Sequence, residues 1–145
     1  GRLTNEERDE VKKHPIWTLQ ILERVSAFEH FAEASARHHE RIDGRGYPWG
    51  IADHDLDFTS RVLAASDVYE ALTADRPYRA GMDIPKALGI MSGDRGSGFD
   101  PTVFDAAAAM AEQGEFAQLA SAGDEPFDVL RAEQQLSAKR RTNRA

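Results

Sequence analysis

The segment HHERIDGRGYP, residues 38–48, divides the sequence into two helical halves. Just before it, apolar residues at positions 28, 31, 32 and 36 are spaced as on one face of a helix, which predicts a helix ending near Arg41. Residues 42–55 read IDGRGYPWGIADHD, which is rich in glycine and lacks the alternation of a strand. We therefore predict a long loop over 42–55. Loops of this length are usually functional or disordered, and Tyr47 and Trp49 argue against disorder.

Helical signals also precede this segment. Thr4 and Glu7 have the spacing of a capping box, and the acidic residues around them suit the first turn of a helix, which is predicted to run to about Lys13. Because the residue before a proline avoids the helical region, the chain is expected to change direction at His14-Pro15. Apolar residues at positions 17, 21, 22 and 25 then predict a second amphipathic helix over 16–26.

The sequence after the loop is helical as well. Apolar residues at positions 62, 65, 69 and 72 form one stripe and predict a helix over 57–74. Asp83 can cap a helix over 84–92. The segment 102–113 contains AAAAMA and has high helix propensity, and a last helix is expected over 126–136. No segment has a convincing strand pattern, so the predicted fold class is all-α.

The composition is that of one globular domain and excludes several classes of protein. The chain has 145 residues and a formal net charge of −7, which argues against a general nucleic-acid or anionic-membrane binder. No apolar stretch approaches the roughly 18 residues of a membrane span, and the first ten residues lack the apolar core of a signal peptide. Cysteine is absent, which removes disulfides, thiolate metal sites and cysteine nucleophiles. A cytoplasmic location fits these features best.

Three features could carry chemistry: His14, the pair His38-His39, and Asp67. Neutral imidazole and carboxylate groups are preferred ligands of divalent first-row metals, and no thiolate competes for the ion. Adjacent histidines on one helix would point about 100° apart. Both imidazoles could then bind one metal only if the ion lies in the wedge between them. Otherwise each would bind one of two neighbouring metals.

Each of these features also has a structural reading. A histidine before a proline, or a His-His pair on a helix, is about as often exposed to solvent as bound to a metal. Asp67 lies among apolar residues of the predicted helix 57–74, where it needs a partner. That partner could be Arg61 or Arg76 instead of a metal. Spacing alone leaves both readings open.

A longer pattern favours the metal reading. HHERIDGRGYP at 38–48, taken with LTNEERDEVKKHP at 3–15 and SRVLAASDVYEALTADRPYR at 60–79, resembles the HD-GYP family. These are metal-dependent phosphohydrolases of the HD superfamily that act on cyclic di-GMP. The order and gaps agree over about residues 1–110: a histidine before proline, a His-His-Glu-x-x-Asp-Gly-x-Gly-Tyr-Pro block, then Arg-x-x-x-x-x-Asp and Arg-Pro-Tyr-Arg. The resemblance implies an HD-type, all-α helical bundle.

The resemblance also implies roles for individual residues. The residues that match the family's metal ligands, for two or three ions of iron or manganese, are His14, His38, His39 and Asp67. The residues that match the loop on the substrate side of the pocket are Gly46, Tyr47 and Pro48. Those that match basic residues near the substrate phosphates are Arg76 and Arg79. Two further acids of the motif, expected to support the ligands or to fix the loop, are Glu40 and Asp43.

The activity implied is metal-assisted hydrolysis of a phosphodiester. A metal-bound water attacks phosphorus, while cationic groups stabilise the charge on the phosphoryl oxygens. Because the protein is acidic, the attraction for an anionic substrate has to be local. The arginines close to the motif are Arg37, Arg41, Arg45, Arg76 and Arg79. For Arg37 and Arg45, a solvated basic face is the alternative reading.

One part of the family pattern is absent from this sequence. The family's His-Asp pair and the lysine after it lie N-terminal to the segment that matches residues 1–15, whereas the His54-Asp55 dipeptide here follows the loop. The catalytic residues of this chain are therefore unknown, and two hypotheses remain. The chain is the C-terminal part of a cyclic di-GMP phosphodiesterase, lacking the N-terminal helices of the bundle. Alternatively, it is a catalytically inactive module that binds a nucleotide or a partner and has an incomplete metal site.

The resemblance also predicts how the chain is organised. Residues 1–113 are expected to be the C-terminal portion of an HD-GYP domain, 114–136 a helical extension and 137–145 a basic, disordered tail. An upstream sensor or regulatory domain is expected. An apolar face left uncovered by missing helices, with Trp17 or Phe31 on it, would favour a homodimer. The expected ligand is cyclic di-GMP or a related cyclic dinucleotide.

Overall fold

A computed structural model describes residues 3–76 and 79–116 of the chain. Its elements, in order, are α1 (Asn5–Val11), α2 (His14–Leu22), α3 (Glu29–Ala36), the 3₁₀ helix η1 (Asp53–Asp55), α4 (Phe58–Thr73), α5 (Ile84–Met91), the 3₁₀ helix η2 (Ser92–Asp94) and α6 (Pro101–Glu112). In these two ranges extended backbone pairs only as isolated bridges, so the all-α prediction is confirmed. By its contacts the chain divides after Ala109, and the features below belong to the unit before that division.

The first two helices begin with recognisable signals, although their boundaries differ from the prediction. Thr4 caps α1 in the predicted capping box with Glu7, but α1 ends at Val11 rather than near Lys13. The break between the helices lies before His14, and Pro15 lies inside the first turn of α2. The expected change of direction at the proline was therefore misplaced by about one residue. A proline is tolerated in the first helical turn because the N–H that it lacks has no partner there.

Helix α3 ends at Ala36, five residues earlier than predicted. His38 and His39 therefore lie in the turn after α3 and not on a helix. The expected angle between adjacent histidines on one helix was wrong for this reason. Because a turn changes the backbone direction at each residue, it allows both imidazoles to face one place.

The helices after the loop agree closely with the prediction. The Asp57 carboxylate accepts the Ser60 N–H and caps α4, and Asp83 caps α5 by accepting the Lys86 N–H. Helix α6 begins one residue earlier than expected. The helix and tail predicted over 126–145 lie outside the described residues, and the domain boundaries stay a prediction. None of the described helices is long and apolar enough to cross a membrane.

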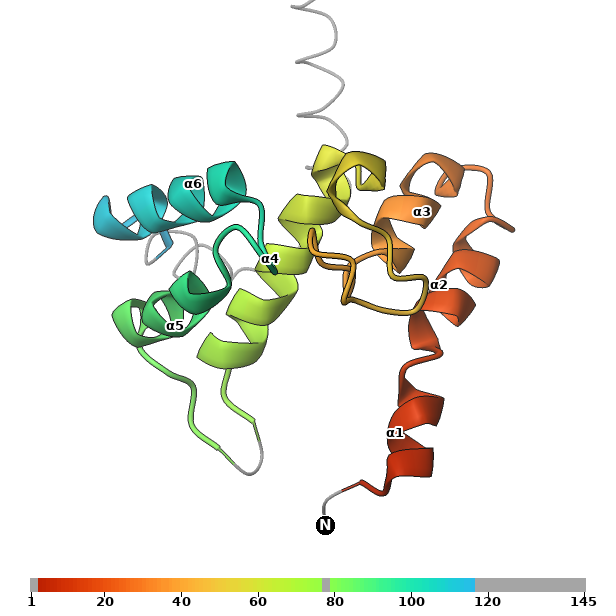
Figure 1. The fold of residues 1–145 in the computed structure, drawn as a ribbon, viewed down its shortest axis with the longest axis horizontal. Helices are drawn as coiled ribbons and strands as arrows, with labels where there is room; N and C mark the ends of the chain where they lie inside the picture. Colours follow the sequence, from red (N-terminus) through yellow and green to blue (C-terminus); the bar gives the residue numbers. More distant parts are fainter. Residues whose placement is uncertain (1–2, 77–78, 117–145) are drawn as a thin grey trace, which may run out of the picture. The chain divides into compact units, whose positions relative to one another are not determined.

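Helix α4 is the central element of this unit (Figure 1), with α3 packed against it on one side and α5 on the other. Helix α2 packs in turn on α3. The buried core lies where α4, α5 and α6 meet and consists of Ala65, Met91, Phe99, Val103 and Phe104. On the α2–α3 side, by contrast, Trp17 and Phe31 are 47% and 52% exposed. The apolar face expected at these two residues is therefore open to solvent.

Candidate metal centre

Three histidines from two segments of the chain come together in the structure. His14 is the first residue of α2, and His38 and His39 follow α3, which packs against α2. The ring centroids of His38 and His39 are 4.1 Å apart, and His14 lies 5.2 Å from the first and 4.9 Å from the second. One ligand atom of each imidazole lies within 4.8 Å of the others. The packing of α2 on α3 thus builds a cluster of three metal-ligating side chains.

Backbone carbonyls orient two of these rings. Nδ1 of His14 lies 2.8 Å from the Val11 carbonyl oxygen, and Nδ1 of His38 is hydrogen-bonded to the Ser35 carbonyl. These acceptors assign the ring proton to Nδ1 and leave the lone pair on Nε2, as in most metal-bound histidines. The two Nε2 atoms are 3.1 Å apart. Two facing lone pairs repel, and a metal ion bound by both nitrogens would remove this repulsion.

The donor set fits a divalent first-row ion. Two nitrogen ligands about 2.1 Å from one ion and about 90° apart are separated by roughly 3 Å, close to the Nε2–Nε2 distance here. The three imidazoles are only partly buried, so an ion can reach them from solvent. The cluster could therefore bind a metal; the sequence of the chain offers nitrogen and carboxylate donors and no thiolate.

Asp67 belongs to the same group of side chains. From α4 its Oδ2 lies 3.5 Å from Nδ1 of His39. The alternative partners considered for Asp67 are engaged elsewhere: Arg61 pairs with Asp53 and Asp100 at 2.7 Å each, and Arg76 pairs with Glu70 at 2.6 Å. The ion-pair reading of Asp67 with either arginine is therefore wrong.

His39 is held in its neutral form. The pKa of its imidazole is lowered to about 4, chiefly by burial and also by the neighbouring His38 and His14, while Asp67 opposes the shift. Neutral imidazole is the form that binds metals. The environment of His39 therefore suits a ligand at neutral pH.

The lowered pKa of His39 predicts how stability depends on pH. Between pH 6.5 and about 4 the unfolded chain binds a proton at His39 that the folded chain does not, so the metal-free protein should lose stability as pH falls through this range. The measurement is the melting temperature at pH 7, 6 and 5 with a chelator present. His39→Gln should flatten this dependence, whereas the control His54→Gln, at an 81% exposed side chain, should not. Equal slopes in wild type and His39→Gln would contradict the prediction.

Glu40 ties the following loop to the histidine turn. Its side chain is almost fully buried, at 2% exposure. Oε1 accepts the backbone N–H groups of Trp49 at 2.8 Å and Gly50 at 3.2 Å, and Oε2 accepts that of Ile51 at 3.0 Å. One carboxylate thus satisfies three successive backbone donors. In this structure Glu40 fixes the loop.

The Gly46-Tyr47-Pro48 segment crosses the histidine turn at close range. A Cβ on Gly46 would lie 2.5 Å from Glu40 Cα and 2.6 Å from the His39 carbonyl oxygen, so only glycine fits there. Tyr47 N–H donates to that carbonyl at 3.2 Å, and its ring stacks on the His39 imidazole with centroids 4.6 Å apart. The Tyr47–Pro48 peptide bond is cis. The loop therefore places an aromatic ring directly beside the histidine cluster.

The candidate phosphate-binding arginines have other partners in the structure. The Arg76 guanidinium pairs with Glu70, and Arg79 donates to the carbonyls of Ala71 and Leu72 at the end of α4. Their role near a substrate stays a prediction. Arg37 pairs with Glu33 and with Asp57, so its charge is largely compensated.

Two residues near the site were missed by the sequence reasoning. The Lys12 ammonium lies 5.7 Å from the centroid of the Tyr47 ring, in cation–π geometry. Asp94 contacts Arg41 across 53 residues of sequence. The sequence analysis did not single out Lys12, and no local signal marks Asp94.

Comparisons with known proteins find related sequences. A family model described as HD domain matches residues 1–103. A 3'3'-cGAMP-specific phosphodiesterase of Vibrio cholerae is 40% identical over 106 residues, 73% of this chain and 23% of that protein. A cyclic di-GMP phosphodiesterase of Pseudomonas aeruginosa is 40% identical over 109 residues, 73% of this chain and 26% of that protein. The cyclic di-GMP phosphodiesterase response regulator RpfG of Xanthomonas campestris is 36% identical over 110 residues, 73% of this chain and 29% of that protein. The chain spans about a quarter of the length of these relatives.

Proposed function

The chain belongs to the HD domain family, in its HD-GYP group, and on this premise we propose that it contributes part of the active site of a metal-dependent phosphodiesterase that hydrolyses cyclic di-GMP. The observation that carries the proposal is the convergence of His14, His38 and His39 beside Tyr47. Similarity to the cyclic dinucleotide phosphodiesterases supports the substrate class.

In this proposal the three histidines and Asp67 hold divalent ions, two or three in the complete site, with iron or manganese as the candidates. Bound ions of this kind lower the pKa of a coordinated water and neutralise charge on phosphoryl oxygens. Val11 and Ser35 carbonyls keep Nε2 of His14 and His38 free for a metal, and Asp67 orients His39 from α4. The chain's own contribution is therefore a set of preoriented donors.

The loop contributes the substrate side of the site. Glu40 holds residues 49–51, and Tyr47 presents its ring next to His39. Lys12 adds a positive charge above the Tyr47 ring, where an anionic phosphodiester would be attracted. Arg76 and Arg79 would have to leave their present partners to contact a phosphate.

Two alternatives to this proposal remain. The Vibrio relative named as specific for 3'3'-cGAMP is as similar as the cyclic di-GMP enzyme, so cGAMP is the second candidate substrate. That this chain by itself is a catalytically inactive module, which binds a nucleotide or a partner, stays a prediction. A homodimer, an attached sensor domain and a cytoplasmic location stay predictions.

Metal binding by the histidines is the first test. The chain, freed of metal by a chelator, should bind Mn²⁺ in calorimetric titration, and His14→Ala or His38→Ala should each weaken binding by about a hundredfold because each removes one donor atom. His54→Ala is the matched control, since His54 is exposed and pairs with Asp55. Unchanged Mn²⁺ affinity in both cluster variants would refute the proposed ligand set.

Turnover is the second test of the same proposal. The chain, and a longer version that includes the preceding codons of its gene, are incubated with Mn²⁺ or Fe²⁺ and with cyclic di-GMP or cGAMP, and the products are separated by chromatography. Hydrolysis by the longer protein alone would support the first hypothesis. Binding without hydrolysis by both would favour the binding module, and neither binding nor hydrolysis would refute both hypotheses.

A further inference from the structure

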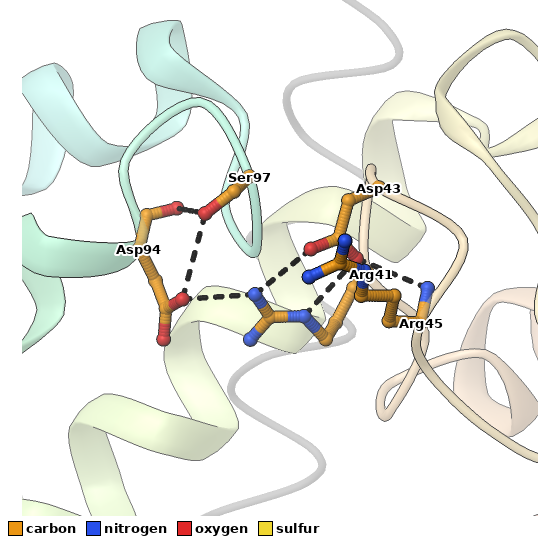
Figure 2. A network of polar contacts seen from close by, with 5 residues as sticks. All are labelled: Arg41, Asp43, Arg45, Asp94 and Ser97. Atoms are coloured by element: carbon orange, nitrogen blue, oxygen red, sulfur yellow. Dashed lines mark hydrogen bonds and ion pairs between the residues drawn. The ribbon is translucent and has the colours of Figure 1, made fainter.

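Arg41 connects the motif loop to a turn far away in the sequence. Figure 2 shows its guanidinium between two carboxylates. Nε and Nη2 of Arg41 donate to the two oxygens of Asp43 at 3.2 and 3.1 Å, and Nη2 also donates to Oδ1 of Asp94 at 2.8 Å. The side chain of Arg41 is 32% exposed, and that of Asp43 is 19% exposed. We call Arg41, Asp43 and Asp94 the arginine clamp.

Backbone contacts run alongside the clamp. The Asp43 N–H donates to the Ser97 carbonyl at 2.9 Å, and the Ile42 N–H donates to that of Gly98 at 3.4 Å. The Asp43 carboxylate also accepts the Arg45 N–H at 3.0 Å. The clamp is therefore one part of a continuous contact between residues 41–45 and residues 94–98.

The far end of the clamp is anchored in the core. The Asp94 carbonyl accepts three backbone N–H groups, from Ser97, Gly98 and Phe99, and the Phe99 side chain is 7% exposed in the core cluster. A Cβ on Gly98 would lie 2.7 Å from Nη1 of Arg41, so the turn packs directly on the guanidinium. Movement of Arg41 relative to this turn is thus restricted on two sides.

The electrostatics agree with a fully charged network. The hydrogen bond from Arg41 lowers the pKa of the Asp94 carboxyl and that of the Asp43 carboxyl. The hydrogen bonds that Arg41 donates to Asp94 and to Asp43 raise the pKa of its guanidinium. All three groups are therefore ionised at neutral pH, and the bonds are of the stronger, charge-assisted kind.

The near end of the clamp lies in the backbone that supports the candidate site. Arg41 comes directly after the pair His39-Glu40. The His39 carbonyl accepts the Tyr47 N–H, and the Glu40 carboxylate holds residues 49–51. We propose that Arg41 is a positioning residue: held by Asp94 and packed against Gly98, it fixes the backbone of residues 39–41 and thereby the placement of the Tyr47 ring for a cyclic dinucleotide. That the Tyr47 ring is placed for a cyclic dinucleotide rests on the proposed function.

The test uses the whole chain and two readouts. In Arg41→Ala, hydrogen exchange of the amides in residues 47–51 should accelerate by about tenfold, because the loop loses a charge-assisted anchor. Hydrogen exchange of the α5 amides should stay as in wild type. A general loss of stability would accelerate exchange in α5 as well, so this readout distinguishes the two explanations. The affinity of the Mn²⁺-loaded chain for cyclic di-GMP should fall by about tenfold in the same variant.

Conservative variants and a matched control sharpen the result. Arg41→Lys keeps the charge and should recover part of both losses, while Gly98→Ala should reproduce them without removing any charge. Lys86→Ala is the control, because it removes one positive charge from an exposed position of α5, outside residues 41–45 and 94–98. It should leave both readouts unchanged.

The outcomes separate this proposal from the proposed function. If wild type binds no cyclic dinucleotide, the proposed function fails, and the exchange experiment still decides on the clamp. Unaltered exchange at residues 47–51 in both Arg41→Ala and Gly98→Ala would overturn the clamp proposal. If Arg41→Ala does not fold, Asp94→Asn decides: faster loop exchange than in wild type supports the clamp, and equal exchange overturns it.

Discussion

Replacing Glu40 by alanine is expected to lower the free energy of unfolding by about 3–5 kcal/mol, because three backbone N–H groups would lose their shared acceptor. The carboxylate is 2% exposed, so solvent cannot replace it without opening the loop. Residues 49–51 should then detach from the histidine turn, and Mn²⁺ binding at the cluster should weaken as well. Urea unfolding followed by circular dichroism gives the first quantity, and calorimetric titration gives the second.

Glutamine at the same position should have an intermediate effect. Its single carbonyl oxygen can still accept the N–H groups of Trp49 and Gly50, whereas its amide NH₂ cannot accept that of Ile51. The expected order of stability is therefore wild type, Glu40→Gln, Glu40→Ala. Glu10→Ala is the control, since Glu10 is 58% exposed and pairs with Lys13, a surface pair worth at most about 1 kcal/mol. A Glu40→Ala protein as stable as this control would show that the loop does not depend on the buried carboxylate.

Gly46→Ala is expected to have the second largest effect. The added Cβ would lie 2.5 Å from Glu40 Cα and 2.6 Å from both the Arg41 nitrogen and the His39 carbonyl oxygen. All three are backbone atoms, so the strain cannot be relieved by rotating a side chain, and the cost should be about 3 kcal/mol or more. Because the loop and the histidine turn must move apart, the stacking of Tyr47 on His39 should also be lost.

The control for Gly46 is another glycine with open space around it. Gly89, in α5, has nothing within 4 Å of an added Cβ, so Gly89→Ala should be neutral or stabilise the helix by up to about 1 kcal/mol. The two variants are compared by thermal unfolding and by Mn²⁺ titration. Similar melting temperatures for both would contradict the close approach seen at Gly46.

How much of the structure was predictable depends on the range of each signal. Capping residues act on N–H groups two or three positions away, so Thr4 and Asp83 marked helix starts correctly. Helix ends were less accurate: α3 stops at Ala36 although the apolar spacing predicts a helix ending near Arg41. That early end removed the helical geometry assumed for His38 and His39 and allowed both to join His14.

The sequence by itself determined the all-α class, the capped starts of α1 and α5 and the identity of the motif residues, because these depend on neighbours within one or two helical turns. Only the tertiary structure decided which of those residues meet. His14 and His38 are 24 positions apart and come within 3.1 Å because α2 packs on α3. Asp94 reaches Arg41 across 53 positions because the turn before Phe99 is anchored in the core. Contacts of this kind arise from burying apolar surface between helices, and no local spacing in the sequence encodes them.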